Sequence, residues 1–218
     1  VALARAAGRP FGVYVHIPFC ARRCGSCDFN TYTPAELNDP DGAMRPAYAE
    51  AVVAEVGLAR RVLGQTDRPV TSVFFGGGTP TVMRTTELSG ILAAISAEFG
   101  LVSGAEITIE ANPDSVTPQS LETLRRGGFN RISFGVQSAV PHVLATLDRT
   151  HDPDNVPQAV RWAREAGFDQ LSVDLIYGTP GETMADWRAS VEQAIALEPD
   201  HISAYALIVE QGTAFARK

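Results

Sequence analysis

The most informative part of the chain is an apolar run that ends in three cysteines, Tyr14-Val15-His16-Ile17-Pro18-Phe19-Cys20-Ala21-Arg22-Arg23-Cys24-Gly25-Ser26-Cys27. These are the only cysteines among the 218 residues. Three thiolates this close in sequence can converge on one inorganic centre, whereas an iron–sulfur cube has four irons and normally takes four thiolates. One iron is then left without a protein ligand, and an open coordination position is typical of a catalytic centre.

Two simpler explanations compete with an iron–sulfur site. A disulfide scaffold favours an even number of cysteines in a short secreted chain, but this chain is long, its count is odd, and its first residues do not resemble a signal peptide. A structural zinc site takes four ligands, often in two separated pairs. The fourth ligand here would be His16, Asp28 or a distant residue, so zinc stays open on spacing alone. Arg22 and Arg23 either lower the pKa of the thiols or face solvent.

Composition narrows the class of protein. The length suits one large domain or two small ones, and a hydrophobic content of 45% supports a sizeable core. No apolar run reaches the length of a membrane span, so we expect no transmembrane segment. The net charge of −7 does not favour a nucleic-acid partner. Reduced cysteines without an export signal indicate the cytoplasm.

Six apolar runs alternate with segments of helical spacing. The runs span residues 11–17, 70–75, 106–111, 131–136, 171–177 and 201–209. They show little strict alternation, which is typical of strands buried on both faces of a parallel sheet. Thr117-Pro118 and Asp152-Pro153 are typical helix starts. Six strands and five helices predict an α/β fold, either a (β/α) barrel or a doubly wound sheet.

The domain organisation follows from this alternation. We expect residues 1–10 to form a loose tail and residues 11–218 to form one core domain, with residues 34–46 as a long surface loop. The chain stops soon after the sixth strand, so no sixth helix is expected. We interpret the chain as truncated at its C-terminal end.

Unusual residues follow one strand after another, where parallel barrels place their active sites. The second run is followed by a glycine-rich segment, Gly76-Gly77-Gly78-Thr79-Pro80, whose backbone can approach a ligand closely. It is not a P-loop, because it lacks the Gly-Lys-Thr ending. Glu110 ends an apolar strand and needs a partner, either a ribose diol or an arginine. Gln137 follows the fourth run, and Asp174 lies inside the fifth, with Arg149 as its candidate partner.

The ordered motifs closely resemble the radical S-adenosylmethionine (SAM) superfamily, and within it the oxygen-independent coproporphyrinogen III oxidase-like group. The resemblance spans residues 11 to about 213 and rests on residues 14–20, 75–81, 135–138 and 174–178. It implies a partial (β/α)6 TIM-like barrel of the radical SAM type, without the C-terminal region that the family usually carries. It also implies a [4Fe–4S] cluster whose fourth iron is chelated by SAM.

The family motifs imply roles for individual positions. Cys20, Cys24 and Cys27 match the cluster ligands. The positions that match contacts to the first SAM are Tyr14, Gly77 and Glu110. Those that match contacts to a second SAM are Gly78, Thr79, Gln137, Arg149 and Asp174, and Ala206 is added as a further cofactor contact.

One departure separates two branches of the group. The oxidases carry a further cysteine two residues after the third, where this chain has Phe29. The ending Cys27-Asp28-Phe29-Asn30 and residues 205–213 resemble the heme chaperone (HemW-like) branch. The resemblance thus implies heme binding and transfer to an acceptor protein, with an electron donor such as flavodoxin or ferredoxin. The alternatives are a coproporphyrinogen III oxidase, which acts on a porphyrinogen, and a related radical SAM methyltransferase.

The histidines are weaker candidates. His142 and His151 are possible axial heme ligands, but both adjoin turn residues, and surface histidines are commoner. His16 lies close to the cysteine loop, where we expect it to form a hydrogen bond.

Overall fold

The computed structural model describes residues 9–64 and 68–217, so most of the expected N-terminal tail lies outside the described residues. It contains one sheet of six parallel strands that are neighbours in chain order. The strands are β1 (Gly12–Ile17), β2 (Val70–Gly77), β3 (Leu101–Ala111), β4 (Arg131–Gln137), β5 (Gln170–Tyr177) and β6 (His201–Ala206).

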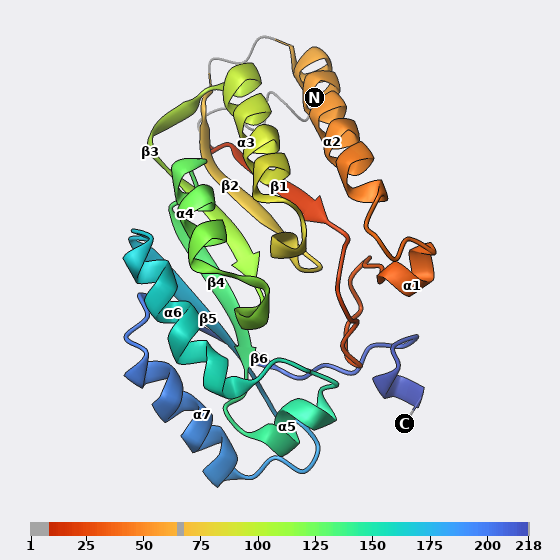
Figure 1. The fold of residues 1–218 in the computed structure, drawn as a ribbon, viewed down its shortest axis with the longest axis vertical. Helices are drawn as coiled ribbons and strands as arrows, with labels where there is room; N and C mark the ends of the chain where they lie inside the picture. The colour runs from red at the N-terminus through yellow and green to blue at the C-terminus, as the bar shows by residue number, and fades with distance from the viewer. Residues whose placement is uncertain (1–8, 65–67, 218) are drawn as a thin grey trace.

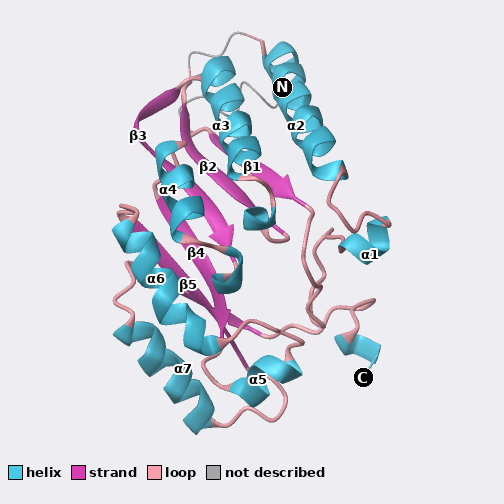
Figure 2. Ribbon diagram, viewed as in Figure 1, coloured by secondary structure: helices cyan, strands magenta, loops and turns pink. Residues whose placement is uncertain are grey.

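The helices are α1 (Pro34–Leu37), α2 (Met44–Leu63), α3 (Thr85–Phe99), α4 (Pro118–Arg126), α5 (Pro141–Thr146), α6 (Val156–Glu165) and α7 (Met184–Ala196). Helices cover one face of this sheet, and the two shortest of them, α1 and α5, lie beyond the carboxyl ends of the strands (Figure 1 and Figure 2). A doubly wound sheet would reverse its strand order at a switch point. Strands in chain order with helices outside are the arrangement of a barrel. Because the order begins at β1 and ends at β6, the barrel is partial and open, as predicted.

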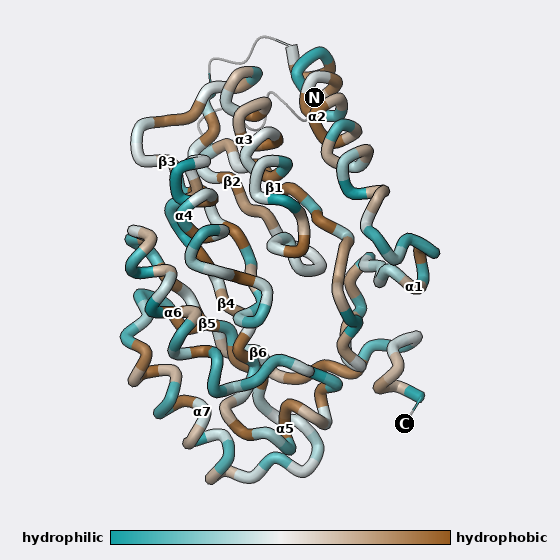
Figure 3. Tube along the Cα trace, in the orientation of Figure 1, coloured by the Kyte–Doolittle hydropathy of each residue, from teal (hydrophilic) through white to brown (hydrophobic). Residues whose placement is uncertain are grey.

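Apolar side chains between the sheet and the helices form one continuous core. The largest fully buried side chains include Phe75, Phe129, Phe134 and Phe168. The rings of Phe75 and Phe129 meet edge to face at a centroid distance of 5.0 Å. Figure 3 shows hydrophobic residues along the strands, and hydrophobic residues alternating with hydrophilic ones along the helices. Burial of each such ring contributes about 2–3 kcal/mol, so this core fixes the strands whose ends carry the site.

The structure differs from the predicted elements at five places. The segment 34–46, expected as a loop, contains α1 and the start of α2. Helix α1 begins at a capping box in which Thr33 and Glu36 bond each other's backbone. The sixth strand ends at Ala206 rather than at residue 209, and β3 begins five residues before the expected start. The short helix α5 was not predicted, and the Asp152-Pro153 signal begins a single 3-10 turn, η4 (Pro153–Asn155), before α6.

The cysteine loop leaves β1 and is tied to distant parts of the chain. Cys20 donates its backbone N–H to the Tyr32 carbonyl at 3.0 Å, and Phe215 donates to the Gly25 carbonyl at 2.8 Å. Figure 1 shows the C-terminal segment returning to this side of the sheet, near α1. Among the described residues, no helix combines the length and the apolar character that crossing a membrane requires.

Candidate cofactor site at the carboxyl ends of the strands

A cavity of about 380 Å³ lies at the carboxyl ends of the strands. Its volume falls in the usual range for a small-molecule site, about 300–1,000 Å³. All but one of the residues predicted for the site line it. They are Cys20, Cys24, Cys27, Gly77, Gly78, Thr79, Glu110, Gln137, Arg149, Asp174 and Ala206. The exception is Tyr14, which stacks on Phe74 at a centroid distance of 6.1 Å.

The three cysteines are free thiols at the edge of this cavity. Cys20 is buried, and Cys24 and Cys27 are half-buried and joined by a backbone hydrogen bond of 3.2 Å. Across residues 9–64 and 68–217, no three His, Cys, Asp or Glu side chains converge on a point where one metal ion would fit. A four-iron cube is wider than one ion and does not require such convergence.

Of the two alternatives for Arg22 and Arg23, their exposed positions agree with the one in which they face solvent. Burial and the neighbouring Cys27 thiol raise the pKa of Cys20. Arg149 donates from Nη1 to the Cys24 sulfur at 3.4 Å, whereas Arg23 pairs with Glu36 at 3.2 Å and bonds the Thr31 carbonyl. The cation that contacts a thiol therefore comes from the segment after α5 rather than from the cysteine loop itself.

The glycine segment after β2 packs directly on the cysteine loop. Gly78 donates its N–H to the Ile17 carbonyl at 2.7 Å. A Cβ at Gly78 would lie 2.5 Å from the Phe19 carbonyl oxygen and 3.0 Å from the Cys20 sulfur. A Cβ at Gly77, whose φ is +114°, would lie 2.5 Å from the His16 ring. Glycine is thus required here both for close approach and for backbone conformation.

Glu110 is the most perturbed carboxylate of the cavity. Its Oε2 accepts the Gly77 N–H at 3.1 Å. Burial, together with the nearby charge of Asp174, raises its pKa to about 7, while the Gly77 hydrogen bond opposes that rise. In the described part of the chain no arginine pairs with it, so the arginine alternative is not observed. Glu110 also raises the pKa of Tyr14, after the effect of burial.

His16 forms the hydrogen bonds that its position predicted. Its Nδ1 lies 3.0 Å from the Tyr14 hydroxyl, and its Nε2 lies 2.8 Å from the Asn30 carbonyl oxygen. The carbonyl is only an acceptor, so Nε2 carries the proton and Nδ1 accepts from the hydroxyl. This pair links β1 to the end of the cysteine loop.

The expected ion pair between Arg149 and Asp174 is wrong. Asp174 instead accepts a hydrogen bond of 3.0 Å from the Ser133 hydroxyl, and burial raises its pKa. Arg149 donates from Nη2 to the Gly135 carbonyl at 2.9 Å, in addition to its contact with Cys24. Each side chain had a nearer partner that its position in the sequence did not reveal.

Two buried polar atoms in the cavity wall lack a hydrogen-bond partner. They are Oε1 of Gln137 and Nε of Arg149. Gln137 sits at an irregularity between β4 and β5 and has a φ of +64°. Leaving such groups unpaired costs about 1–3 kcal/mol each. The polar side chains of this wall, together with the three free cysteines beside them, fit a cluster with a SAM molecule beside it.

Sequence reasoning missed the apolar side of the cavity. Phe29, Tyr205 and Ile208 line it and are about 60% exposed, at 63%, 58% and 65%. Large apolar side chains so exposed are typical of binding surfaces. Their signal in the sequence was an apolar residue within a loop and two apolar residues beside the end of the last strand.

Comparison with known proteins places these features in a family. The family model described as the radical SAM superfamily matches residues 14–194. A heme chaperone HemW from Mycobacterium tuberculosis is 47% identical over 217 residues, covering 99% of this chain and 54% of that protein. An oxygen-independent coproporphyrinogen III oxidase from Synechocystis is 36% identical, covering 90% of this chain and 41% of that protein.

A solved structure shares the fold. Coproporphyrinogen III oxidase (HemN) from Escherichia coli, titled a radical SAM enzyme, superposes with a TM-score of 0.82 at 30% identity. The match covers 95% of this chain and 46% of that one. The chain thus spans about half the length of the relatives it matches.

Proposed function

The chain belongs to the radical SAM superfamily, and on that premise we propose that it forms the cluster- and SAM-binding part of a heme chaperone. The family implies a [4Fe–4S] cluster and SAM. Such a cluster supplies one-electron reduction of SAM, and the protein supplies binding, orientation and electrostatics. The cavity that joins three free cysteines to the glycine segment and Glu110 carries this proposal.

In this proposal each wall of the cavity has one task. Cys20, Cys24 and Cys27 hold the cluster and leave one iron for SAM. The backbone of Gly77 borders the first SAM without a Cβ in the way, with Tyr14 beside it, and Gly78 and Thr79 border the place of a second SAM. Glu110 accepts hydrogen bonds from the ribose hydroxyls, and the remaining polar contacts come from Gln137, Arg149, Asp174 and the Ala206 backbone.

Two observations favour heme transfer over porphyrinogen oxidation. Phe29 stands where the resemblance expects a fourth cysteine in the oxidases, and its exposed ring lines the cavity. Several relatives that match over more than 90% of this chain are named heme chaperone HemW. Phe29, Tyr205 and Ile208 give heme, which is large, flat and apolar, a surface on which to pack.

The oxidase is the second candidate because the Synechocystis relative and the HemN structure carry that name. A radical SAM methyltransferase of the same group is the third. All three share the cluster and the SAM site, and they differ in what lies against the apolar side of the cavity. An electron donor such as flavodoxin or ferredoxin, and for the chaperone a heme-accepting protein, complete the proposal.

Anaerobic reconstitution tests the shared part on the 218-residue chain. We expect about four irons per chain and a change in the electron paramagnetic resonance spectrum of the reduced cluster when SAM is added. Cys24→Ala should lose both. If SAM did not change the spectrum of the reduced cluster, all four irons would already have ligands. The proposal that SAM binds the fourth iron would then fail.

Substrate tests separate the candidates. Heme is titrated into the chain and into a full-length relative, and coproporphyrinogen III is supplied with SAM and reductant in parallel. Stable heme absorption without protoporphyrinogen supports the chaperone. Formation of protoporphyrinogen would overturn it in favour of the oxidase.

A further inference from the structure

The tip of the cysteine loop is held between two segments that lie far from it in the sequence. Gly25 stands between the second and third cysteines, and it is the one buried residue of the fully described segment 21–30. Its N–H donates to the Leu147 carbonyl at 3.3 Å, and its carbonyl accepts the Phe215 N–H at 2.8 Å. Both backbone groups of Gly25 therefore bind partners outside the loop.

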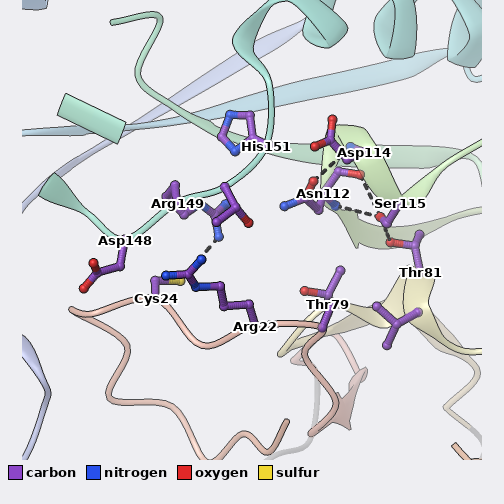
Figure 4. Close-up of a pocket in the computed structure, with 13 residues that line it drawn as sticks. Arg22, Cys24, Thr79, Thr81, Asn112, Asp114, Ser115, Asp148, Arg149 and His151 are labelled. Atoms are coloured by element: carbon purple, nitrogen blue, oxygen red, sulfur yellow. Dashed lines mark hydrogen bonds between the residues drawn. The ribbon is translucent and has the colours of Figure 1, made fainter. Parts of the chain in front are cut away.

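The Leu147 side of this contact is rigid. Leu147 follows directly on α5, and its side chain is buried together with those of Val143 and Leu144 on that helix. The next residue, Asp148, has a φ of +55° and lines a second cavity beside the cofactor cavity (Figure 4). A Cβ at Gly25 would collide with the Asp148 carboxylate. The loop approaches α5 this closely because glycine occupies its tip.

The other side of the contact is a strap, residues 207–217, which continues from the end of β6. The strap is attached to the sheet where the Leu207 N–H donates to the Tyr177 carbonyl at 2.8 Å. Residues 208–212 are exposed, and the strap then turns at Thr213, whose buried hydroxyl bonds the backbone on both sides of it. This turn carries the N–H that reaches the tip of the cysteine loop.

We propose that α5 and the strap form a clamp that positions the cysteine loop for the cluster, with Phe215 as the positioning residue on the strap. The inference rests on the cluster site proposed above. Cys24 and Cys27 lie on either side of Gly25 and are half-buried, and metal ligands keep their places through the contacts that support them. Of the two hydrogen bonds at the tip, only the longer one to Leu147 would remain without the strap. Exposed segments with few buried contacts open more readily than the core, so the strap determines how long the loop keeps its cluster-binding shape.

Limited trypsin digestion of the cluster-free chain tests the clamp without any cofactor. Arg22 and Arg23 are exposed beside the loop tip, so the rate of cleavage after them reports how often the loop opens. Phe215→Pro removes the N–H at the first residue of the 3-10 turn Phe215–Arg217, a position that proline fits, whereas Phe215→Ala keeps it. We expect Phe215→Pro to raise this rate about fivefold, as the loss of one hydrogen bond predicts, and Phe215→Ala to raise it less. Cleavage after the exposed Arg61 on α2 is the internal control and should not change.

Iron retention after anaerobic reconstitution measures the consequence for the cluster. Phe215→Pro should lose iron to a chelator about fivefold faster than the unmodified chain, and SAM should change the electron paramagnetic resonance spectrum of its reduced cluster less. Gly25→Ala should also lose iron faster, because its Cβ meets the Asp148 carboxylate. Asp148→Gly removes that carboxylate and suits the φ of +55°. It should restore iron retention when combined with Gly25→Ala and should change little alone.

The outcomes separate the clamp from the cluster proposal. If the unmodified chain retains no iron after reconstitution, the cluster site fails, while trypsin digestion still decides whether the strap holds the loop. The clamp is overturned if Phe215→Pro is cleaved after Arg22 and Arg23 at the rate of the unmodified chain. It is also overturned if Phe215→Ala acts as strongly as Phe215→Pro, or if Asp148→Gly fails to restore iron retention to Gly25→Ala.

Discussion

Replacing Glu110 by glutamine is expected to stabilise the ligand-free chain at pH 8 and to weaken its binding of SAM. Glu110 is half-buried in the wall of the cofactor cavity, and its pKa is raised from 4.5 to about 7. Glutamine has nearly the same shape and retains an oxygen for the Gly77 N–H, which is 3.1 Å away in the structure. The substitution therefore removes the buried charge and leaves the packing and the hydrogen bond in place.

The sign and size of the effect follow from proton linkage. Between pH 4.5 and pH 7 the folded chain holds a proton on Glu110 that the unfolded chain has released. The free energy of unfolding therefore falls as pH rises through this range. A pKa difference of this size corresponds to at most about 3 kcal/mol, since one pKa unit is worth about 1.4 kcal/mol. Glu110→Gln should recover up to this amount at pH 8 and almost none at pH 4.5.

Urea denaturation of both proteins at several pH values between 4.5 and 8 measures the difference. Glu106→Gln is the matched control, because Glu106 lies on the same strand with its side chain exposed, and exposed substitutions usually change stability by less than about 0.5 kcal/mol. A stability difference for Glu110→Gln that stays constant from pH 4.5 to pH 8 would refute the reasoning, since it would show that the charge of Glu110 is not what destabilises the fold.

The same carboxylate links SAM binding to pH. Ribose hydroxyls donate best to an ionised carboxylate, so SAM affinity should rise by up to about tenfold per pH unit below pH 7 and level off above it. In Glu110→Gln the affinity should be lower and this dependence should vanish. Calorimetric titration at pH 6 and pH 8 provides the measurement, and equal affinities of the unmodified chain at both values would count against a role for Glu110 in SAM binding.

Three other substitutions test separate parts of the structure. Gly78→Ala places a Cβ 2.5 Å from the Phe19 carbonyl, so the iron retained after reconstitution should fall; Gly90→Ala, in an open helical position, should keep full iron and gain about 1 kcal/mol. His151 binds a proton more readily in the unfolded chain than in the folded chain. The free energy of unfolding should therefore fall by up to about 3 kcal/mol as the pH drops from 6.5 to 4. Urea denaturation of His151→Phe should show a smaller fall over the same pH range. Phe29→Ala should weaken heme uptake in an absorbance titration and leave iron content unchanged, whereas unchanged heme uptake would remove Phe29 from the heme surface.

The sequence predicts the strands and the place of the site because both depend on short-range patterns. Strands buried on two faces read as continuous apolar runs. The carboxyl ends of parallel strands meet at one edge, so Gly77, Glu110 and Asp174 could be placed together before any coordinates were known. The spacing of the cysteines alone could not decide between an iron–sulfur cluster and a zinc ion. The family resemblance made that choice and added SAM.

Side-chain partners were not predictable, because they depend on tertiary geometry. Arg149 and Cys24 are 125 positions apart, and nothing in the sequence marks them as neighbours. His151 was expected at the surface because turn residues surround it, yet the cavity wall encloses it. The capping box of Thr33 and Glu36 was hidden in a segment whose proline and aspartate content favours a loop.

The ligand-free cavity holds groups that a ligand would satisfy, and this bears on stability as well as on function. Glu110 and Asp174 have raised pKa values because they are buried, and Gln137 and Arg149 each bury an unpaired polar atom. A ligand present at 100 times its Kd stabilises the fold by about 2.7 kcal/mol. This is close to the free energy of unfolding that the charge of Glu110 costs at pH 8. SAM should therefore raise the melting temperature of the unmodified chain more than that of Glu110→Gln. If SAM raised the melting temperatures of the unmodified chain and of Glu110→Gln equally, the charge of Glu110 would have no part in SAM binding.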